Sequence, residues 1–262
     1  MNLLPPIHAA RFSSPTWYDG KPMLNPTPRS FPHTGHIYDV AVIGAGLAGS
    51  ELAYHLAQAG QDVLLVTQSL DSVGNLYHPS VDFAFPEGSF LQMALEKSLP
   101  DRSLWMFHRN VKQTLELTPG IHLLQSCVTS IQTGERFRLS TWEGPERLAR
   151  KVVLAVGSFL EARLTMGSIT EESGRLSEIA YDFLYQDLLQ QGFAFEEVQQ
   201  QSPATGEAIP YTVTFKVFAP AEQDGFHLKR IPELYALGRC LHGEHTYQSV
   251  VQDAHKLLEV LK

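Results

Sequence analysis

Three closely spaced glycines are the residues of this sequence that indicate a chemical function most directly. They lie in one short run, Gly44-Ala45-Gly46-Leu47-Ala48-Gly49. In a GxGxxG pattern the first glycine lets the chain turn sharply out of a strand, the second lets the backbone approach a pyrophosphate, and the third lets a helix pack close to the strand. The N–H groups at the start of that helix would bind the phosphates, so we expect the six residues to hold a dinucleotide.

The segments around the glycine run have the pattern of a strand–helix–strand unit. Residues 38–43 form a short apolar run, as expected for a buried parallel strand. Apolar residues then recur at helical spacing as far as Gly60, a natural helix end, and residues 63–66 form a second apolar run. The alternative is an ordinary glycine turn in a βαβ unit that binds no nucleotide.

The end of the second predicted strand carries no charge. An acidic residue normally stands there and binds the adenosine ribose, but this chain has Thr67 and Gln68. The nearest acids are Asp62, at the other end of the strand, and Asp71, four residues late. We therefore expect a hydroxyl, an amide or the backbone to contact the ribose.

Three later features favour FAD over NAD or NADP as the cofactor. An antiparallel β-meander follows the nucleotide-binding half, and a buried strand then ends at Gly157 and Ser158. A late strand ends at Gly238 and Arg239 and leads through His245 into the last helix. In FAD domains of the glutathione-reductase type this last unit closes over the flavin, and the helix dipole favours negative charge there. Backbone atoms near Val128 would hold the adenine.

The predicted fold is α/β, a Rossmann-like FAD/NAD(P)-binding domain of the glutathione-reductase type, with a parallel sheet and an inserted β-meander. Residues 1–37 form a proline-rich, irregular N-terminal arm, and 38–262 form the FAD-binding domain, with the insertion at about 121–150. The periodicity predicts helices at 89–98, 102–117, 177–191 and 246–261, and strands at 121–124, 128–132, 137–142, 152–155, 193–195, 211–218 and 234–238.

Several motifs resemble those of the GidA (MnmG) family of FAD-dependent tRNA wobble-uridine modification enzymes. The run from Leu64 through Asp71 to Asn75 resembles the segment after that family's second strand, and the run from Val152 to Leu160 resembles its middle motif. The segments 141–145 and 174–178 match the short, stand-alone GidA-related flavoproteins most closely. The resemblance implies the fold, FAD as cofactor and an oxidoreductase activity.

Departures from the family concern its catalytic loop and its tRNA. The family carries a catalytic cysteine after the Asn75 position, where this chain has Leu76-Tyr77-His78-Pro79. Tyr77 and His78 are our candidate catalytic residues, since a histidine beside a flavin can transfer a proton. The chain is short for the family's helical tRNA-binding region, and its net charge of −8 opposes contacts with phosphates. We therefore do not expect tRNA as a partner.

No metal site is predicted. The segment His242-Gly-Glu-His245 is not an HExxH motif and has no evident third ligand. The two cysteines, Cys127 and Cys240, form no CxxC pair, and their low number fits a reducing cytoplasm. Cys240 has a redox role as its less favoured interpretation, because buried thiols are usually structural.

Three hypotheses about function stay open at this stage. The first is a cytoplasmic FAD-dependent oxidoreductase that acts on an unknown small molecule or protein partner, with no membrane segment and with an oligomeric state that the sequence does not define. The second is a non-catalytic or accessory flavoprotein that acts through a partner, including one associated with tRNA modification. The third is a nicotinamide-dependent dehydrogenase, which the neutral Thr67 and Gln68 disfavour.

Overall fold

The computed structural model describes residues 17–18, 21–22, 35–76, 83–100, 103–202 and 210–262. The chain divides into two units, residues 1–33 and residues 34–262. In the first unit, β1 (Trp17–Tyr18) pairs antiparallel with β2 (Lys21–Pro22). The second unit carries all the features below, and the boundary at residue 37 stays a prediction. No helix within the described segments is long and apolar enough to cross a membrane.

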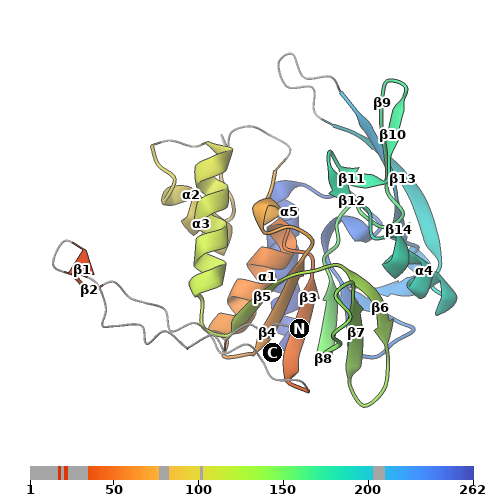
Figure 1. Cartoon of the computed structure of the whole chain (residues 1–262), viewed down its shortest axis with the longest axis horizontal. Coiled ribbons are helices and arrows are strands. Elements are labelled where there is room, and N and C mark those ends of the chain that lie inside the picture. Colours follow the sequence, from red (N-terminus) through yellow and green to blue (C-terminus); the bar gives the residue numbers. More distant parts are fainter. Residues whose placement is uncertain (1–16, 19–20, 23–34, 77–82, 101–102, 203–209) are drawn as a thin grey trace, which may run out of the picture. The chain divides into compact units, whose positions relative to one another are not determined.

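A largely parallel sheet forms the centre of the second unit (Figure 1). Strand β3 (Ile37–Ile43) lies between β4 (Val63–Thr67) and β8 (Arg147–Leu154) and is parallel to both. Strand β5 (Ile121–Gln125) continues the sheet beyond β4, and β17 (Leu234–Ala236) continues it beyond β8. Two short antiparallel strands, β16 (His227–Leu228) and β15 (Gln223–Asp224), extend that second edge.

The two faces of this sheet carry different layers. Helices α1 (Leu47–Gln58), α2 (Phe90–Glu96), α3 (Leu104–Leu117) and α5 (Tyr247–Leu261) cover one face, where Leu52, Leu65 and Leu257 are fully buried. The other face packs on β6 (Val128–Gln132), β7 (Phe137–Thr141) and α4 (Asp182–Gln190). Burial on both faces explains why β3 and β4 are continuous apolar runs rather than alternating ones.

A second, antiparallel sheet has the strand order β10-β9-β14-β13. Its strands are β9 (Arg163–Met166), β10 (Ile169–Glu171), β13 (Phe195–Gln201) and β14 (Thr212–Phe218). Beside it, β11 (Ser173–Arg175) and β12 (Glu178–Ile179) form a small hairpin. Three single 3₁₀ turns complete the described elements, η1 (Leu70–Ser72), η2 (Pro220–Glu222) and η3 (Gly238–Cys240).

Hydroxyl side chains cap the starts of α2, α3 and α5. Ser89 accepts a hydrogen bond from the Gln92 N–H at the start of α2, and Ser103 accepts one from the Met106 N–H at the start of α3. Thr246 and Ser249 form a reciprocal capping box at the start of α5. Each side chain satisfies N–H groups that have no partner within the helix, which stabilises the helix by about 1 kcal/mol.

The structure corrects three sequence-based assignments. Residues 121–124 belong to β5 of the parallel sheet, so the antiparallel insertion begins at β6 and not at 121. The helix expected from Ser177 begins at Asp182, because Ser177 has φ 61° in the turn of the β11–β12 hairpin. The strand expected at 193–195 begins at Phe195 and runs to Gln201, where polar alternation hid its length.

Glu222 joins three segments of the second unit, and its removal tests this packing. The carboxylate is 4% exposed and accepts hydrogen bonds from Arg230 at 2.6 and 2.7 Å and from the Ala194 N–H at 3.1 Å. The bonds from Arg230 lower the pKa of Glu222 below its usual 4.5. We expect Glu222→Gln to lower the free energy of unfolding by about 1–2 kcal/mol at pH 7. The expected loss is modest because Arg230 is half exposed, and solvent screens its attraction to Glu222.

The pH dependence gives this prediction a sign. A carboxylate with a lowered pKa in the folded state stabilises the protein above the unfolded-state pKa, and this contribution disappears as the pH falls through the folded-state value. The difference between wild type and Glu222→Gln, measured by urea unfolding, is therefore expected to shrink below about pH 4.5. Glu197→Gln is the control, because the Glu197 side chain is 61% exposed in its ion pair with Lys216 and its loss should change stability little. An equal effect of both variants would contradict the assigned role.

Candidate functional site

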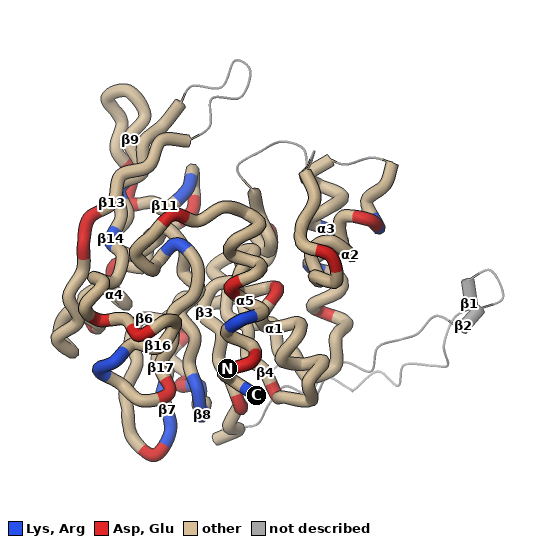
Figure 2. Tube along the Cα trace, turned by 180° about the vertical axis from the view of Figure 1, so that it is seen from behind, with Lys and Arg blue, Asp and Glu red and all other residues tan. Residues whose placement is uncertain are grey.

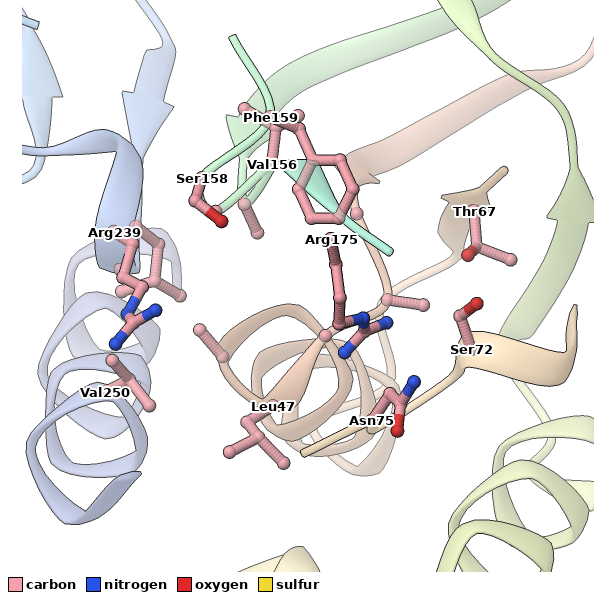
Figure 3. A pocket seen from close by; sticks show the side chains of 18 of the residues that line it. Leu47, Thr67, Ser72, Asn75, Val156, Ser158, Phe159, Arg175, Arg239 and Val250 are labelled. Carbon is pink, nitrogen blue, oxygen red and sulfur yellow. The ribbon is translucent and has the colours of Figure 1, made fainter. Parts of the chain in front are cut away.

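A cleft opens where the parallel strands β17, β8, β3 and β4 end (Figure 3). The carboxyl ends of parallel strands at one sheet edge are the usual ligand-binding position of this class of fold. Most of the predicted cofactor contacts line the cleft, namely Gly44, Ala45, Gly46, Leu47, Ala48, Thr67, Gln68, Gly157, Ser158, Gly238, Arg239 and His245. Its empty space is about 950 Å³, part of it open to solvent.

The three glycines of the GxGxxG run have three different surroundings. A Cβ on Gly44, which has φ +108°, would lie 2.3 Å from the Ala155 carbonyl oxygen, and a Cβ on Gly49 would lie 1.9 Å from the Gly44 carbonyl oxygen. These two positions therefore exclude any side chain through contacts with the protein's own backbone. A Cβ on Gly46 would meet nothing within 4 Å, so the open space of the cleft begins there. Gly49 itself does not line the cleft.

The N-terminus of α1 faces this open space. Gly46 is the N-cap residue, and no side chain caps the helix. The first N–H groups of a helix have no partner within the helix, and the helix dipole adds partial positive charge. An open, uncapped helix start beside a glycine fits the pyrophosphate of a dinucleotide.

Neutral side chains line the end of the cleft next to β4. The Thr67 hydroxyl donates to the Ser69 carbonyl at 3.0 Å, and the Gln68 amide donates to the Cys127 Sγ at 3.9 Å. Asp71 turns away from the cleft, with its side chain 98% exposed. An adjoining cavity extends past Gln68 to Cys127 and Trp142. Val128, predicted near the adenine, is fully buried in β6 and lines neither space.

Two further turns close the cleft from the β8 side. Gly157 has φ +57°, and the Ser158 hydroxyl donates to the Gly174 carbonyl at 3.2 Å. A Cβ on Gly174 would lie 2.4 Å from the Phe159 ring, so this ring packs directly against the β11 backbone. The hairpin β11–β12 is thereby held against the cleft, which sequence reasoning missed.

Arg175 of that hairpin projects into the cleft towards Leu47 and Asn75 (Figure 3). Its guanidinium donates to Glu178 at 2.6 Å, and the side chains of both residues are mostly buried. The pairing of β11 with β12 places Arg175 in the cleft. The sequence did not indicate this hairpin, because the residues after Arg175 have the pattern of a helix start. The cleft also includes contacts that were not predicted, namely Ser69, Ser72, Asn75, Phe159, Arg175, Glu178, Tyr181, Tyr247 and Val250.

Gly238, Arg239 and His245 form the opposite end of the cleft, next to the start of α5. A Cβ on Gly238, with φ +74°, would lie 3.4 Å from Ala48, so the chain passes close to α1. The His245 Nε2 donates a hydrogen bond to the Leu241 carbonyl at 3.2 Å. Its Nδ1 is buried and has no hydrogen-bond partner among the described residues. In that tautomer Nδ1 is an acceptor suited to a ligand donor.

Both thiols of the chain are buried, and neither lines the cleft. Burial raises the pKa of Cys127 to about 11 and that of Cys240 to about 11. The Cys240 thiol is fully buried and donates to the Leu154 carbonyl at 3.2 Å. The thiolate is the nucleophilic form of cysteine, and it is almost absent at neutral pH for both residues.

The candidate catalytic residues Tyr77 and His78 lie outside the described residues. The described residues on either side of them lie at the cleft or contact it. Asn75 lines the cleft, and the Phe83 ring stacks on Tyr247 with centroids 4.9 Å apart. Tyr247 lines the cleft at the start of α5.

The parallel sheet, the glycine turn at α1 and the two later turns at Gly157 and Gly238 define a dinucleotide-binding domain of the flavoprotein class. The model of the family "Glucose inhibited division protein A" (GidA) matches residues 39–84 and 97–227, more than half of the chain. The chain belongs to the GidA family. With this membership and this fold, FAD is the cofactor.

Two solved structures and one curated relative are similar to this chain in sequence or fold. The GidA-related protein of Thermus thermophilus is 40% identical, with a TM-score of 0.78 over 86% of this chain and 97% of that chain. GidA of Aquifex aeolicus has the same fold at 14% identity, with a TM-score of 0.68 over 83% of this chain and 61% of that chain. The tRNA uridine 5-carboxymethylaminomethyl modification enzyme MnmG of Chlamydia trachomatis serovar A is 30% identical over 220 residues, 72% of this chain. The chain spans about a third of the length of that protein, 35%.

Gly46 offers a direct test of the cleft. We expect Gly46→Val to leave the fold intact, because its Cβ points into open space, and to weaken FAD binding about tenfold or more by filling that space. Fluorescence titration of the apoprotein with FAD measures the affinity, and thermal unfolding without FAD measures the fold. Gly49→Ala is the matched variant and should instead lower the stability of the apoprotein, since its Cβ meets the Gly44 carbonyl oxygen. Unchanged FAD affinity in Gly46→Val would exclude Gly46 as the pyrophosphate contact.

Proposed function

We propose that this protein is an FAD-dependent oxidoreductase. The observation that carries the proposal is the convergence of two helix starts, those of α1 and α5, on one cleft at the carboxyl ends of the parallel strands. One helix start suits the pyrophosphate, and the other suits a group that becomes negatively charged on reduction. FAD would supply hydride or electron transfer, and the protein would bind, orient and polarise it.

Particular residues have roles in this proposal. The N–H groups after Gly46 bind the pyrophosphate, and the neutral Gln68 and Ser69 contact the adenosine ribose in place of an acid. The buried Nδ1 of His245 accepts a hydrogen bond from a donor of the cofactor. The start of α5 favours negative charge on the flavin by about 0.3–1 kcal/mol. Tyr77 and His78 stay our candidates for proton transfer.

A second cavity next to the cleft is our candidate site for the substrate or the electron donor. This cavity shares Ser158, Arg239 and His245 with the cleft and continues to the β13–β14 hairpin. The hairpin contributes Gln200, Gln201 and Tyr211 to the lining. These neutral hydrogen-bonding groups and one arginine suit a small polar or anionic molecule.

The alternative is an accessory flavoprotein that acts through a partner. The burial and raised pKa of both thiols support this alternative, because neither supplies the nucleophile that the family's tRNA chemistry uses. The two proposals share FAD and differ in whether the isolated protein turns over.

The spectrum of the purified protein tests the proposal first. We expect yellow protein with the absorption of oxidised flavin, and bleaching on anaerobic mixing with NADH or NADPH. Bleaching favours the oxidoreductase, whereas stable colour with either donor favours the accessory protein. Colourless protein that takes up no added FAD would contradict both.

A binding experiment tests the expectation about tRNA. The net charge is −8, and Figure 2 shows basic positions interspersed with acidic ones in the part of the chain that is described. Nucleic-acid affinity depends on clustered Lys and Arg contacts to phosphates. We therefore expect filter binding to bulk tRNA to fail at physiological salt. Tight binding that weakens steeply with added salt would show that a local basic surface outweighs the net charge.

A further inference from the structure

Three side chains that the cofactor site does not use converge on one point. Glu51 and His55 lie one turn apart on α1, and His255 comes from α5. One oxygen or nitrogen atom of each lies within 4.8 Å of the others. None of the three lines the cofactor cleft. Helix α5 packs along α1, so the cluster is fixed by the fold although His255 is 204 residues from Glu51 in the sequence.

The carboxylate of Glu51 is fully buried and held rigidly. Its Oε1 accepts a hydrogen bond from the Phe90 N–H at 2.9 Å, and its Oε2 accepts one from the Leu91 N–H at 3.0 Å. Both N–H groups belong to the first turn of α2. Burial would raise the pKa of Glu51, but hydrogen bonds from His55, His255 and these N–H groups outweigh it and lower the pKa. The two backbone N–H groups thus hold the carboxylate in one orientation, beside the imidazoles of His55 and His255.

One oxygen of this carboxylate has more donors than it can accommodate as a simple hydrogen-bond acceptor. Besides the Phe90 N–H, Oε1 lies 2.9 Å from the His55 Nε2 and 2.7 Å from the His255 Nε2. A carboxylate oxygen offers about two lone-pair sites, and three donors compete for them. Within the described residues, the ion pairs of Glu51 are those with the two histidines. A cation between Oε1 and the two nitrogens would relieve this crowding, because both nitrogens would then bind the ion instead of donating to Oε1.

We propose a binding site for a divalent transition-metal ion such as Zn²⁺, formed by Glu51, His55 and His255. Two imidazole nitrogens and one carboxylate oxygen are a known zinc ligand set, and water completes the coordination. The His55 and His255 side chains are 22% and 37% exposed, which gives water access. The Phe90 and Leu91 N–H groups would orient the carboxylate as outer-shell partners.

The ion would join three helices. It would connect α1 and α5 through their side chains, and α2 through the carboxylate that binds its first turn. Because the unfolded chain does not hold these ligands together, the free energy of metal binding would stabilise the folded state.

The experiment uses the full chain with its FAD, treated with a chelator, dialysed and titrated with ZnCl₂ at pH 7.5. We expect about one equivalent of zinc per chain after gel filtration, and a Tm that rises by roughly 5–10 °C at a hundredfold excess over Kd. His55→Ala and His255→Ala are expected to weaken zinc binding about a hundredfold and to abolish the shift.

Two further variants separate the metal site from other causes. His255→Gln keeps an N–H donor for Glu51 but is a poor zinc ligand, so it should fold as the wild type does and lose the zinc response. His242→Ala removes a histidine that pairs with Glu196 on the surface, and it should bind zinc as the wild type does. Absence of zinc uptake by the wild type, or equal uptake by wild type and His255→Gln, would show that the cluster only links the helices by hydrogen bonds.

Discussion

The close crossing of backbones at Gly44 is the constraint on which the cleft depends. The end of β3, the start of α1 and the end of β8 approach one another so closely that a Cβ at Gly44 would lie 2.3 Å from the Ala155 carbonyl oxygen. The register that sets Ile43 opposite Leu154 brings these two turns together. Leu237 donates its N–H to the Leu154 carbonyl at 2.9 Å, which adds the turn after β17. Three segments far apart in the sequence thus meet at one end of the sheet and line the cleft together.

The cleft has two ends with different chemistry. Near α1 the lining consists of the glycine turn and small or apolar side chains from Gly44 to Ala48, while the neutral Gln68 stands where an acid is usual. The other end contains Arg239, His245 and the start of α5, beside a second cavity with polar side chains. The Chlamydia relative is named for tRNA modification, and this chain spans 35% of its length. The distinction between the oxidoreductase and the accessory protein therefore depends on the second end.

The sequence predicted those parts of the site that local patterns encode. The glycine run needs only its own spacing and the strands on either side, so its place in the cleft follows from about 30 residues. Arg175 could not be found this way, because Ser177 before an amphipathic run has the pattern of a helix cap, whereas pairing with Glu178 made a hairpin. The pairing of β5 with β4 and the hydrogen bond between Glu51 and His255 also depend on contacts between residues far apart in the sequence. No residue next to Glu51 in the sequence indicates them.

Strand β8 has a consequence for how this fold can vary. One edge of β8 pairs with β3 along most of its length, and the other edge is shared, with residues 147–149 paired to β7 and residues 152–154 paired to β17. A longer β7 would displace β17, and with it the turn at Gly238. Inserting one residue into β8 would also invert which side chains face each layer. Phe137, at the tip end of β7, pairs with Ala149, next to the residues of β8 that pair with β17. Extension of the paired strand from the tip of the β6–β7 hairpin is therefore the change in chain length that the shared edge restricts.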